Sequence, residues 1–242
     1  MPVMKVGPGR ALLGGGGNYN DLVMGTRPIA YWPLDESAGT VARCLVNTAQ
    51  NGTYSGVTLA NDNTGPFGTP APRYDGATSY CNVVSAALTA AFSGTLGSVL
   101  TWMKVLNVGI WTDAAWHVYL MFYVNGTNYI QLAKTNANNN LRWVMVSGGA
   151  ISQRDNVAVA STAWMPVGLT WNQAANRVRA YRYGIQDGGD IAGIGVWAGA
   201  FARNVLGANT TVPASPWNGW QGPTVVWNRE LSPAEVKVYS LS

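Results

Sequence analysis

The acidic side chains of this chain include three closely spaced pairs, and paired carboxylates are the groups that hydrolyse glycosidic bonds. A retaining glycosidase holds its two carboxyl groups roughly 5 to 5.5 Å apart. Neighbouring residues of an extended strand point to opposite sides, a glycine-rich loop holds the second pair, and the third pair flanks a predicted helix start. The pairs are Asp35 with Glu36, Asp187 with Asp190, and Glu230 with Glu235. None has the required pattern, so the sequence predicts that the protein is not an enzyme.

The single histidine and the two cysteines offer little nucleophile or metal chemistry. His117 begins an apolar segment and has no recognisable serine or cysteine partner, so it is predicted to be a buried or edge histidine and not part of a triad. Cys44 and Cys81 are too few for a zinc site or a disulfide framework. We expect both to be buried free thiols.

Eleven tryptophans are candidates for binding, because aromatic faces stack on sugar rings and also fill protein interfaces. Some fall within strand patterns and are predicted to be core residues, namely Trp32, Trp102, Trp143, Trp171 and Trp227. Others lie in or beside loops and are the candidates for contacting a glycan or a partner protein, namely Trp111, Trp116, Trp197, Trp217 and Trp220.

Composition excludes several classes of function. Only 11% of the residues are charged, against about 25% in an average soluble protein, and the net charge of +4 is spread thinly. Nucleic-acid binding therefore has little support. The chain has no apolar stretch of the ~20 residues that a membrane span requires. The N-terminus lacks the apolar core of a secretory signal, which predicts synthesis in the cytoplasm.

Short strand patterns separated by turn residues begin at residue 29 and predict an all-β protein. Residues 98–106 are apolar on both faces, as expected of a central strand. Asn125 and Gly126 predict a hairpin between strands at 117–124 and 127–134. A further strand is predicted at 141–147.

Two more strands follow, at 164–172 and 177–184. In the first, Met165, Val167, Leu169 and Trp171 share one face. In the second, Val178 and Ala180 are predicted to face inward, and the outward row is typical either of an interface or of a solvated strand face. That row, a candidate assembly contact, consists of Arg177, Arg179, Tyr181 and Tyr183.

The last part of the chain combines a loop, a strand and a helix. Residues 185–222 are glycine-rich and poor in strand pattern, which predicts a long functional or pinned loop. A strand is predicted at 224–227. Ser232 as N-cap, Pro233 at the first helical position and Glu235 three residues after the cap predict a helix start.

Three segments resemble the laminin-G-like domains of the concanavalin A-like lectin and glucanase superfamily. They are residues 29–59, which contain NGTYSGV, residues 73–83, RYDGATSYCNV, and residues 225–240, VVWNRELSPAEVKVYS. The resemblance implies an antiparallel jelly-roll sandwich over residues 29–242 with a short C-terminal helix. Because this fold hosts lectins, glycosidases, adhesion modules and structural proteins, it implies no single function.

The same resemblance raises the question of calcium. Laminin-G-like domains often bind calcium through an aspartate in the turn that matches Asp75, so Asp75 is a candidate calcium ligand. An aspartate before Gly76 is also typical of a turn residue that bonds its own backbone. No other cofactor is expected.

Residues 1–28 precede the first resembling strand and are predicted to form an extended arm, with four consecutive glycines at 14–17. If such an arm is ordered, its backbone polar groups must pair with something outside it. The sandwich could supply the partner, but we expect a neighbouring subunit. The candidate contact residues are Lys5, Arg10, Leu12, Leu13 and Tyr19.

Low charge, the arm and the missing catalytic pair favour a structural protein of a tailed-bacteriophage virion. The arm would anchor it to the capsid as a decoration or stabilising protein, with tail or fibre attachment as the second choice. Its partners would be major capsid or tail proteins and copies of itself. The alternative is a carbohydrate-binding module or adhesin that recognises a cell-surface glycan through the loop tryptophans, and the two roles are compatible.

Overall fold

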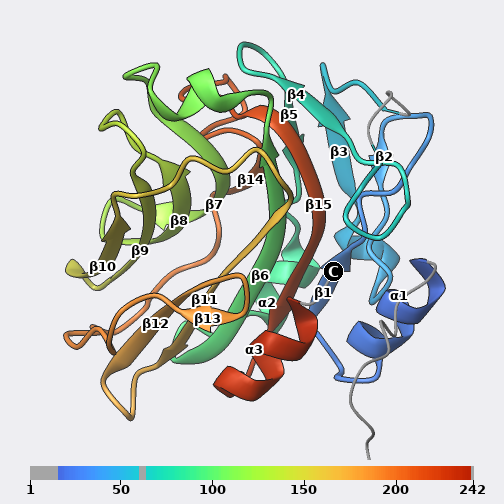
Figure 1. Cartoon of the computed structure of the whole chain (residues 1–242). Helices are drawn as coiled ribbons and strands as arrows, with labels where there is room; N and C mark the ends of the chain where they lie inside the picture. The colour runs from blue at the N-terminus through green and yellow to red at the C-terminus, as the bar shows by residue number, and fades with distance from the viewer. Residues whose placement is uncertain (1–15, 60–63, 241–242) are drawn as a thin grey trace, which may run out of the picture.

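The computed structural model describes residues 16–59 and 64–240, and residues 1–15, 60–63 and 241–242 lie outside the described part. Two antiparallel sheets pack face to face (Figure 1). The seven-stranded sheet has the order β1–β15–β6–β11–β12–β13, with β4 also pairing with β15. Its strands are β1 (Ala30–Trp32), β4 (Arg73–Asp75), β6 (Leu96–Val105), β11 (Met165–Asn172), β12 (Arg177–Arg182), β13 (Ile185–Gln186) and β15 (Asn218–Trp227).

The eight-stranded sheet has the order β10–β9–β8–β7–β14–β5–β3–β2. Its strands are β2 (Val41–Ala42), β3 (Gly52–Ser55), β5 (Tyr80–Asn82), β7 (His117–Asn125), β8 (Asn128–Lys134), β9 (Leu141–Ser147), β10 (Ala150–Asn156) and β14 (Arg203–Leu206). Many neighbouring strands are far apart in the chain, as in a jelly roll. The predicted all-β sandwich is confirmed.

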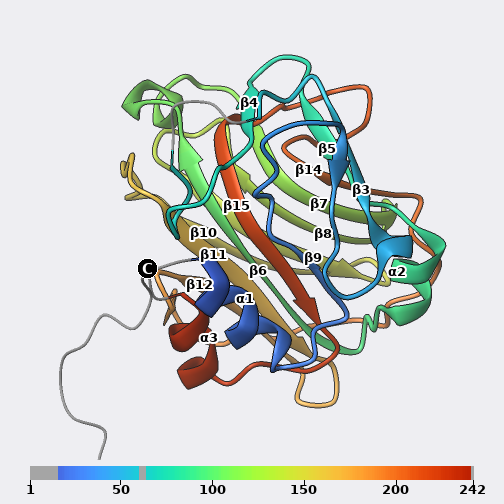
Figure 2. The same cartoon turned by 90° about the vertical axis from the view of Figure 1, so that its right-hand side faces the viewer.

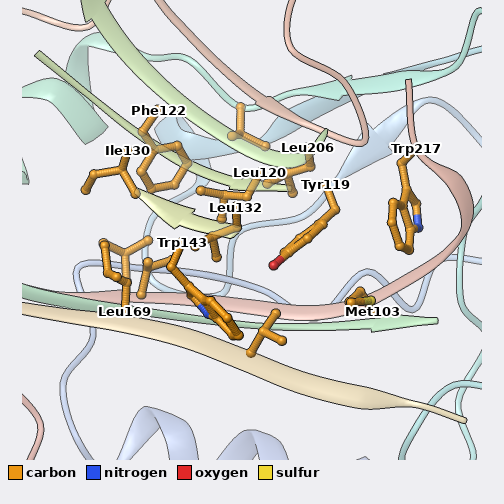
Figure 3. Packing of buried hydrophobic residues seen from close by; sticks show 14 of the residues in the cluster. Met103, Tyr119, Leu120, Phe122, Ile130, Leu132, Trp143, Leu169, Leu206 and Trp217 are labelled. Atoms are coloured by element: carbon orange, nitrogen blue, oxygen red, sulfur yellow. The ribbon is translucent and has the colours of Figure 1, made fainter. Parts of the chain in front are cut away.

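The main core lies between the two sheets. Figure 3 shows Tyr119, Phe122 and Trp143 of the eight-stranded sheet facing Met103 and Leu169 of the other sheet. Their side chains are fully buried. Burial of such large apolar and aromatic groups is the main favourable term in folding, at about 25 cal/mol per Å² of apolar surface.

Strand alternation predicted the core face of β11 correctly. The four residues expected to share one face of β11 all belong to the main core cluster. The strand at 141–147 coincides with β9. The predicted hairpin joins β7 to β8, with Asn125 paired with Asn128. Cys44 and Cys81 are buried free thiols in the same core, as expected.

The expected loop at 185–222 is wrong in three places. β13 lies at its start. β14 lies within it, and β15 begins at Asn218 and includes Trp220, so the final strand is much longer than 224–227. The pairing of β15 with β6 is irregular between Gln221 and Thr224. Pro223 lies within this irregularity, and since proline has no N–H to donate, the ladder is interrupted there.

The described residues also form three α-helices. They are α1 (Gly16–Met24), α2 (Ala86–Ala91) and α3 (Pro233–Tyr239), with short 3₁₀ turns at Thr48–Gln50 and Val108–Trp111. Ser232 and Glu235 form the predicted capping box of α3. None of the helices within the described ranges is long and apolar enough to cross a bilayer.

The prediction of an extended arm is wrong for residues 16–24, which form α1. Tyr19 and Val23 stand four residues apart on one helical face, and both are buried against the outer side of the seven-stranded sheet. Figures 1 and 2 both show α1 beside α3 on this side. The sandwich itself is therefore the partner of this part of the chain. Lys5, Arg10, Leu12 and Leu13 lie outside the described residues.

Aromatic contacts and hydrogen bonds fasten α1 to the sheet. The Tyr19 ring stacks on Phe67 with centroids 3.9 Å apart. The Tyr19 hydroxyl donates to the carbonyl oxygen of Tyr239 in α3 at 3.1 Å and accepts from Trp102 Nε1 at 3.4 Å. Trp227 Nε1 donates to Thr26 Oγ1 at 2.8 Å. Tyr19 is thus an internal anchor and is not exposed for contact with another subunit.

Candidate functional site

Three of the five candidate tryptophans are buried and offer no face to a ligand. Trp111 and Trp217 have no exposed surface, and Trp220 is only 8% exposed. Trp111 Nε1 donates to the Ser161 carbonyl at 2.8 Å, and the ring of Trp217 meets Tyr119 edge-on. The prediction failed because Trp111 and Trp217 pack into the main core cluster, and because Trp220 belongs to β15 and not to a loop.

The other two candidate tryptophans are partly exposed but lie in different places. Trp197 packs with Phe92 and Phe201 beside the main core. Trp116 instead packs against a small apolar cluster of Val118, Met121 and Ala133 that is separate from that core. This cluster belongs to the outer face of the eight-stranded sheet. Among the five candidate tryptophans, Trp116 is the one that packs against it.

The predicted outward row on β12 is largely occupied within the chain. Tyr181 is 1% exposed and belongs to the cluster beneath α1 and α3, so it is not an available contact. Arg177 Nε pairs with Glu230 at 2.7 Å, and Arg179 Nε pairs with Asp190 at 2.6 Å. Of the four residues, Tyr183 remains exposed.

The acidic pairs are likewise bonded within the chain. Asp35 and Glu36 do not point apart as an extended strand would require, because both contact Arg43, at 3.0 and 3.3 Å. Glu36 also accepts a hydrogen bond from the Tyr54 hydroxyl at 2.8 Å. Asp187 accepts a hydrogen bond from Asn156 Nδ2 at 2.7 Å. Glu235 accepts one from the backbone N–H of Ser232, the N-cap of α3.

Asp75 is a turn residue that bonds its own backbone. Its Oδ1 accepts from the backbone N–H groups of Ala77, Thr78 and Ser79, and its Oδ2 accepts from Thr78 Oγ1. Burial would raise the pKa of the carboxyl, but these hydrogen bonds outweigh it and hold the pKa well below its usual range. A calcium ion at Asp75 stays a prediction. Within residues 16–59 and 64–240, no three His, Cys, Asp or Glu side chains gather as a metal site.

His117 lies at the start of β7 and is buried, in agreement with the prediction of a buried or edge histidine. It belongs to a network of charged side chains. Its Nε2 lies 2.6 Å from Asp113 Oδ2, and its Nδ1 lies 2.6 Å from the Pro216 carbonyl oxygen. Lys134, which has no exposed surface, donates to Asp113 Oδ1 at 2.6 Å and to the Ala115 carbonyl at 2.9 Å. The network joins two loops to the ends of β7 and β8.

Strand register aligns a row of side chains across the outer face of the eight-stranded sheet. On β14, β7 and β8, Arg203 pairs with Tyr123, and Tyr123 pairs with Tyr129. The row continues through Val146 of β9 and Ile151 of β10. An arginine and two tyrosines therefore stand side by side on three adjacent strands.

A pocket opens beside this row. Its volume is about 210 Å³, and we call it the tyrosine pocket. Its lining residues are Met121, Tyr123, Tyr129, Gln131, Arg203 and Asn209. Within the described part of the chain, the Tyr123 and Tyr129 hydroxyls and the Gln131 amide make no hydrogen bond. The pocket thus combines aromatic rings with free polar groups.

Cation–π contacts hold the arginines of this face. The guanidinium carbon of Arg203 lies 3.5 Å from the centroid of the Tyr123 ring, and Arg203 Nε donates to the Asn209 carbonyl at 3.2 Å. Arg142 lies 5.3 Å from the Trp116 ring and is paired with Asp155 through two bonds of 2.7 Å. Burial raises the pKa of Tyr129, which keeps its hydroxyl protonated.

Sequence reasoning identified the β7–β8 hairpin but not the pocket on it. Given a tight turn at Asn125 and Gly126, cross-strand pairing of Tyr123 with Tyr129 could have been read from the sequence. The positions of Arg203 and Asn209 could not be read in this way, because both residues lie in the segment that was predicted to be a loop.

Comparison with known protein families finds no match, and comparison with curated proteins finds none either. Solved structures do match. Domain 4 of AbnA, an extracellular GH43 arabinanase from Geobacillus stearothermophilus in complex with arabinotriose, has a TM-score of 0.65 at 17% identity over 88% of this chain and 98% of that chain. The receptor-binding domain of botulinum neurotoxin C/D mosaic serotype gives 0.64 at 12% identity over 89% and 51%.

The Trypanosoma rangeli sialidase in complex with sialic acid has a TM-score of 0.62 at 12% identity over 88% of this chain and 32% of that chain. The chain therefore spans about half of the toxin domain and a third of the sialidase. At these identities the likeness shows the fold alone. It agrees with a β-sandwich of the jelly-roll kind, compatible with the concanavalin A-like resemblance of the sequence.

Proposed function

We propose that the chain is a glycan-binding module without catalytic activity and that the tyrosine pocket receives one sugar residue. The observation that carries this proposal is the alignment of Arg203, Tyr123 and Tyr129 on three adjacent strands around a pocket. Aromatic rings contact the apolar faces of sugars, while hydroxyl, amide and guanidinium groups bond their hydroxyls. At about 210 Å³, the pocket is smaller than the roughly 300–1,000 Å³ of a drug-sized ligand site.

Two further observations support the proposal. The tyrosine pocket lies on a rigid sheet, so its side chains are positioned before a ligand arrives, which lowers the cost of binding. Among the matched structures, the arabinanase domain is described in complex with a trisaccharide, which shows that a domain of this fold can bind a glycan. The acidic residues described above are bonded within the chain, which favours binding over hydrolysis.

A glycan array probed with the full chain tests the proposal, followed by calorimetric titration with the best-bound glycan. Replacing Tyr129→Ala should weaken binding by about tenfold or more, because a stacking face is lost. Tyr183→Ala is the matched control, since Tyr183 is an exposed tyrosine in the turn between β12 and β13 of the other sheet, and it should bind normally. Absence of binding across the array, or binding that survives Tyr129→Ala unchanged, would contradict the proposal.

A structural role in a tailed-phage virion is the second candidate. The observation that favours it is that α1 and the turn after it are fastened to the sandwich through Tyr19, Val23 and Thr26, so a tether at residues 1–15 would hold a folded domain. Deleting residues 2–15 leaves α1 intact and should abolish incorporation into particles while the melting temperature stays unchanged. Normal incorporation of this truncated chain would refute the role.

A further inference from the structure

We propose that the sugar bound in the tyrosine pocket carries a carboxylate, which Arg203 binds; this inference rests on the glycan-binding function proposed above. The starting observation is that Arg203 has no acidic partner among the described residues. Six other arginines in the same range do pair with carboxylates, whereas Arg27, Arg73 and Arg154 form no such salt bridge. The six are Arg43, Arg142, Arg177, Arg179, Arg182 and Arg229.

The contrast is clearest among arginines that line surface pockets. Arg43 lines a pocket together with Asp35 and Glu36, the two carboxylates that it binds. Arg182 lines another together with its partner Asp187. In each case the pocket supplies its own anion. The tyrosine pocket holds an arginine with no carboxylate in its lining.

The Arg203 guanidinium is held in one orientation. One face lies against the Tyr123 ring, with 3.5 Å between the guanidinium carbon and the ring centroid, and Nε is used by the Asn209 carbonyl at 3.2 Å. The two terminal nitrogens, Nη1 and Nη2, make no hydrogen bond to the described residues. A planar edge with two free N–H donors is the geometry that binds a carboxylate through two parallel bonds.

The surroundings would leave a bound carboxylate without repulsion. The lining groups other than Arg203 are all uncharged, namely Met121, Tyr123, Tyr129, Gln131 and Asn209. The pKa of Tyr129 is raised further from neutrality. Asp155, an acidic group on the same outer face, is neutralised by its two bonds to Arg142. Tyr129 and Gln131 remain free to bond the ring hydroxyls of the same sugar. A neutral sugar would use the tyrosines but leave the arginine edge unpaired.

Two matched pairs of probes test the carboxylate. The full chain is titrated by calorimetry with oligogalacturonate and with its methyl ester, and with sialyllactose and lactose. Within each pair, the affinity for the acidic member should be higher by about tenfold or more, as a charge-assisted bidentate contact implies. The preference should weaken as salt is raised, because the contact is ionic.

Variants separate the two proposals. Arg203→Gln should remove the preference for the acidic member of each pair but keep the weaker binding of the neutral one, whereas Tyr129→Ala should weaken both. Arg27→Gln removes an exposed positive charge far from the pocket and should change neither. A melting temperature close to that of the unaltered chain shows that Arg203→Gln is folded.

The outcomes are distinguishable. Equal affinity for acid and ester, with both weakened by Tyr129→Ala, would overturn the carboxylate inference and leave glycan binding intact. A preference for acids that persists in Arg203→Gln would also overturn it. If no probe binds and the glycan array is blank, the function itself is refuted, and the inference with it. Tighter binding of sulfated than of carboxylated sugars would also overturn the inference, because it would show that the pocket recognises negative charge and not the planar carboxylate group.

Discussion

Lys134 is a basic side chain with no exposed surface, and its ammonium group contacts the carboxylate of Asp113. Asp113 accepts its ammonium hydrogen bond at 2.6 Å and also contacts His117. Burial would raise the pKa of Asp113, but the bonds from Lys134 and His117 outweigh it, so the pKa is lowered. An ammonium group buried without a counter-charge is strongly unfavourable.

Asp113→Ala should therefore lower the free energy of unfolding by about 3 to 5 kcal/mol, the usual cost of leaving one partner of a buried pair alone. Urea unfolding followed by tryptophan fluorescence measures this. Lys134→Met should cost clearly less, because Asp113 is partly exposed and can be hydrated. If the two single variants were equally unstable, Lys134 would not be the group that needs compensation.

Asp75 links stability to pH through its turn. Its folded pKa is lowered, so its contribution is fully present above the unfolded pKa of about 4 and is lost as pH falls below that value toward the folded pKa. Asp75→Ala should cost about 1 to 2 kcal/mol at pH 7, as losing a comparable helix cap does. Chemical denaturation at pH 7, 5 and 3 should show the difference from the unaltered chain shrinking with acidity. A constant difference would assign the effect to packing.

At the scale of elements, α1 is the feature that changes the description of the N-terminal region. Its contact with the sheet depends on Tyr19, which stacks on Phe67 and bonds both Tyr239 and Trp102. Tyr19→Phe keeps the stack and loses the hydroxyl bonds, at about 1 kcal/mol. Tyr19→Ala also loses the ring and should cost about 3 to 5 kcal/mol.

Thermal unfolding of these two variants orders the ring and hydroxyl contributions. Met24→Ala provides the control, since Met24 is an exposed residue of the same helix, and it should melt with the unaltered chain. A Tyr19→Ala variant as stable as the unaltered chain would mean that α1 does not contribute to the fold.

The elements also show how far the sequence reaches. Alternation located β9 and the core face of β11, and capping residues located α3, because these signals are local. β14 was missed, since four residues in a glycine-rich segment carry too little pattern. The tyrosine pocket needs the pairing of Arg203 with Tyr123, which stand 80 positions apart, and local patterns do not encode such register. The helical spacing of Tyr19 and Val23 was readable but short.

At the scale of the whole molecule, the two thiols report on opening of the sandwich. Cys44 and Cys81 lie in the same core cluster, and burial raises the pKa of Cys81 well above its usual value. Both should be unreactive to a thiol reagent in the folded protein and both reactive in denaturant. Because one core encloses them, they should be modified at one common rate, measured by mass spectrometry. A faster rate for Cys44 than for Cys81 would show that the segment around Cys44, between β2 and the 3₁₀ turn at Thr48–Gln50, opens without the rest of the core.

The two outer faces of the sandwich carry different features. α1 lies on the outer side of the seven-stranded sheet, whereas the tyrosine pocket lies on the eight-stranded sheet. Figure 1 shows β7, β8 and β9 of that sheet on the opposite side of the molecule from α1. A chip that captures the chain through a label placed before α1 would therefore turn the pocket toward the flowing solution. Capture through a cysteine introduced at Gln153, which is exposed on β10 of the eight-stranded sheet, would press that sheet against the chip. Immobilisation geometry alone would then decide whether large glycans reach the pocket.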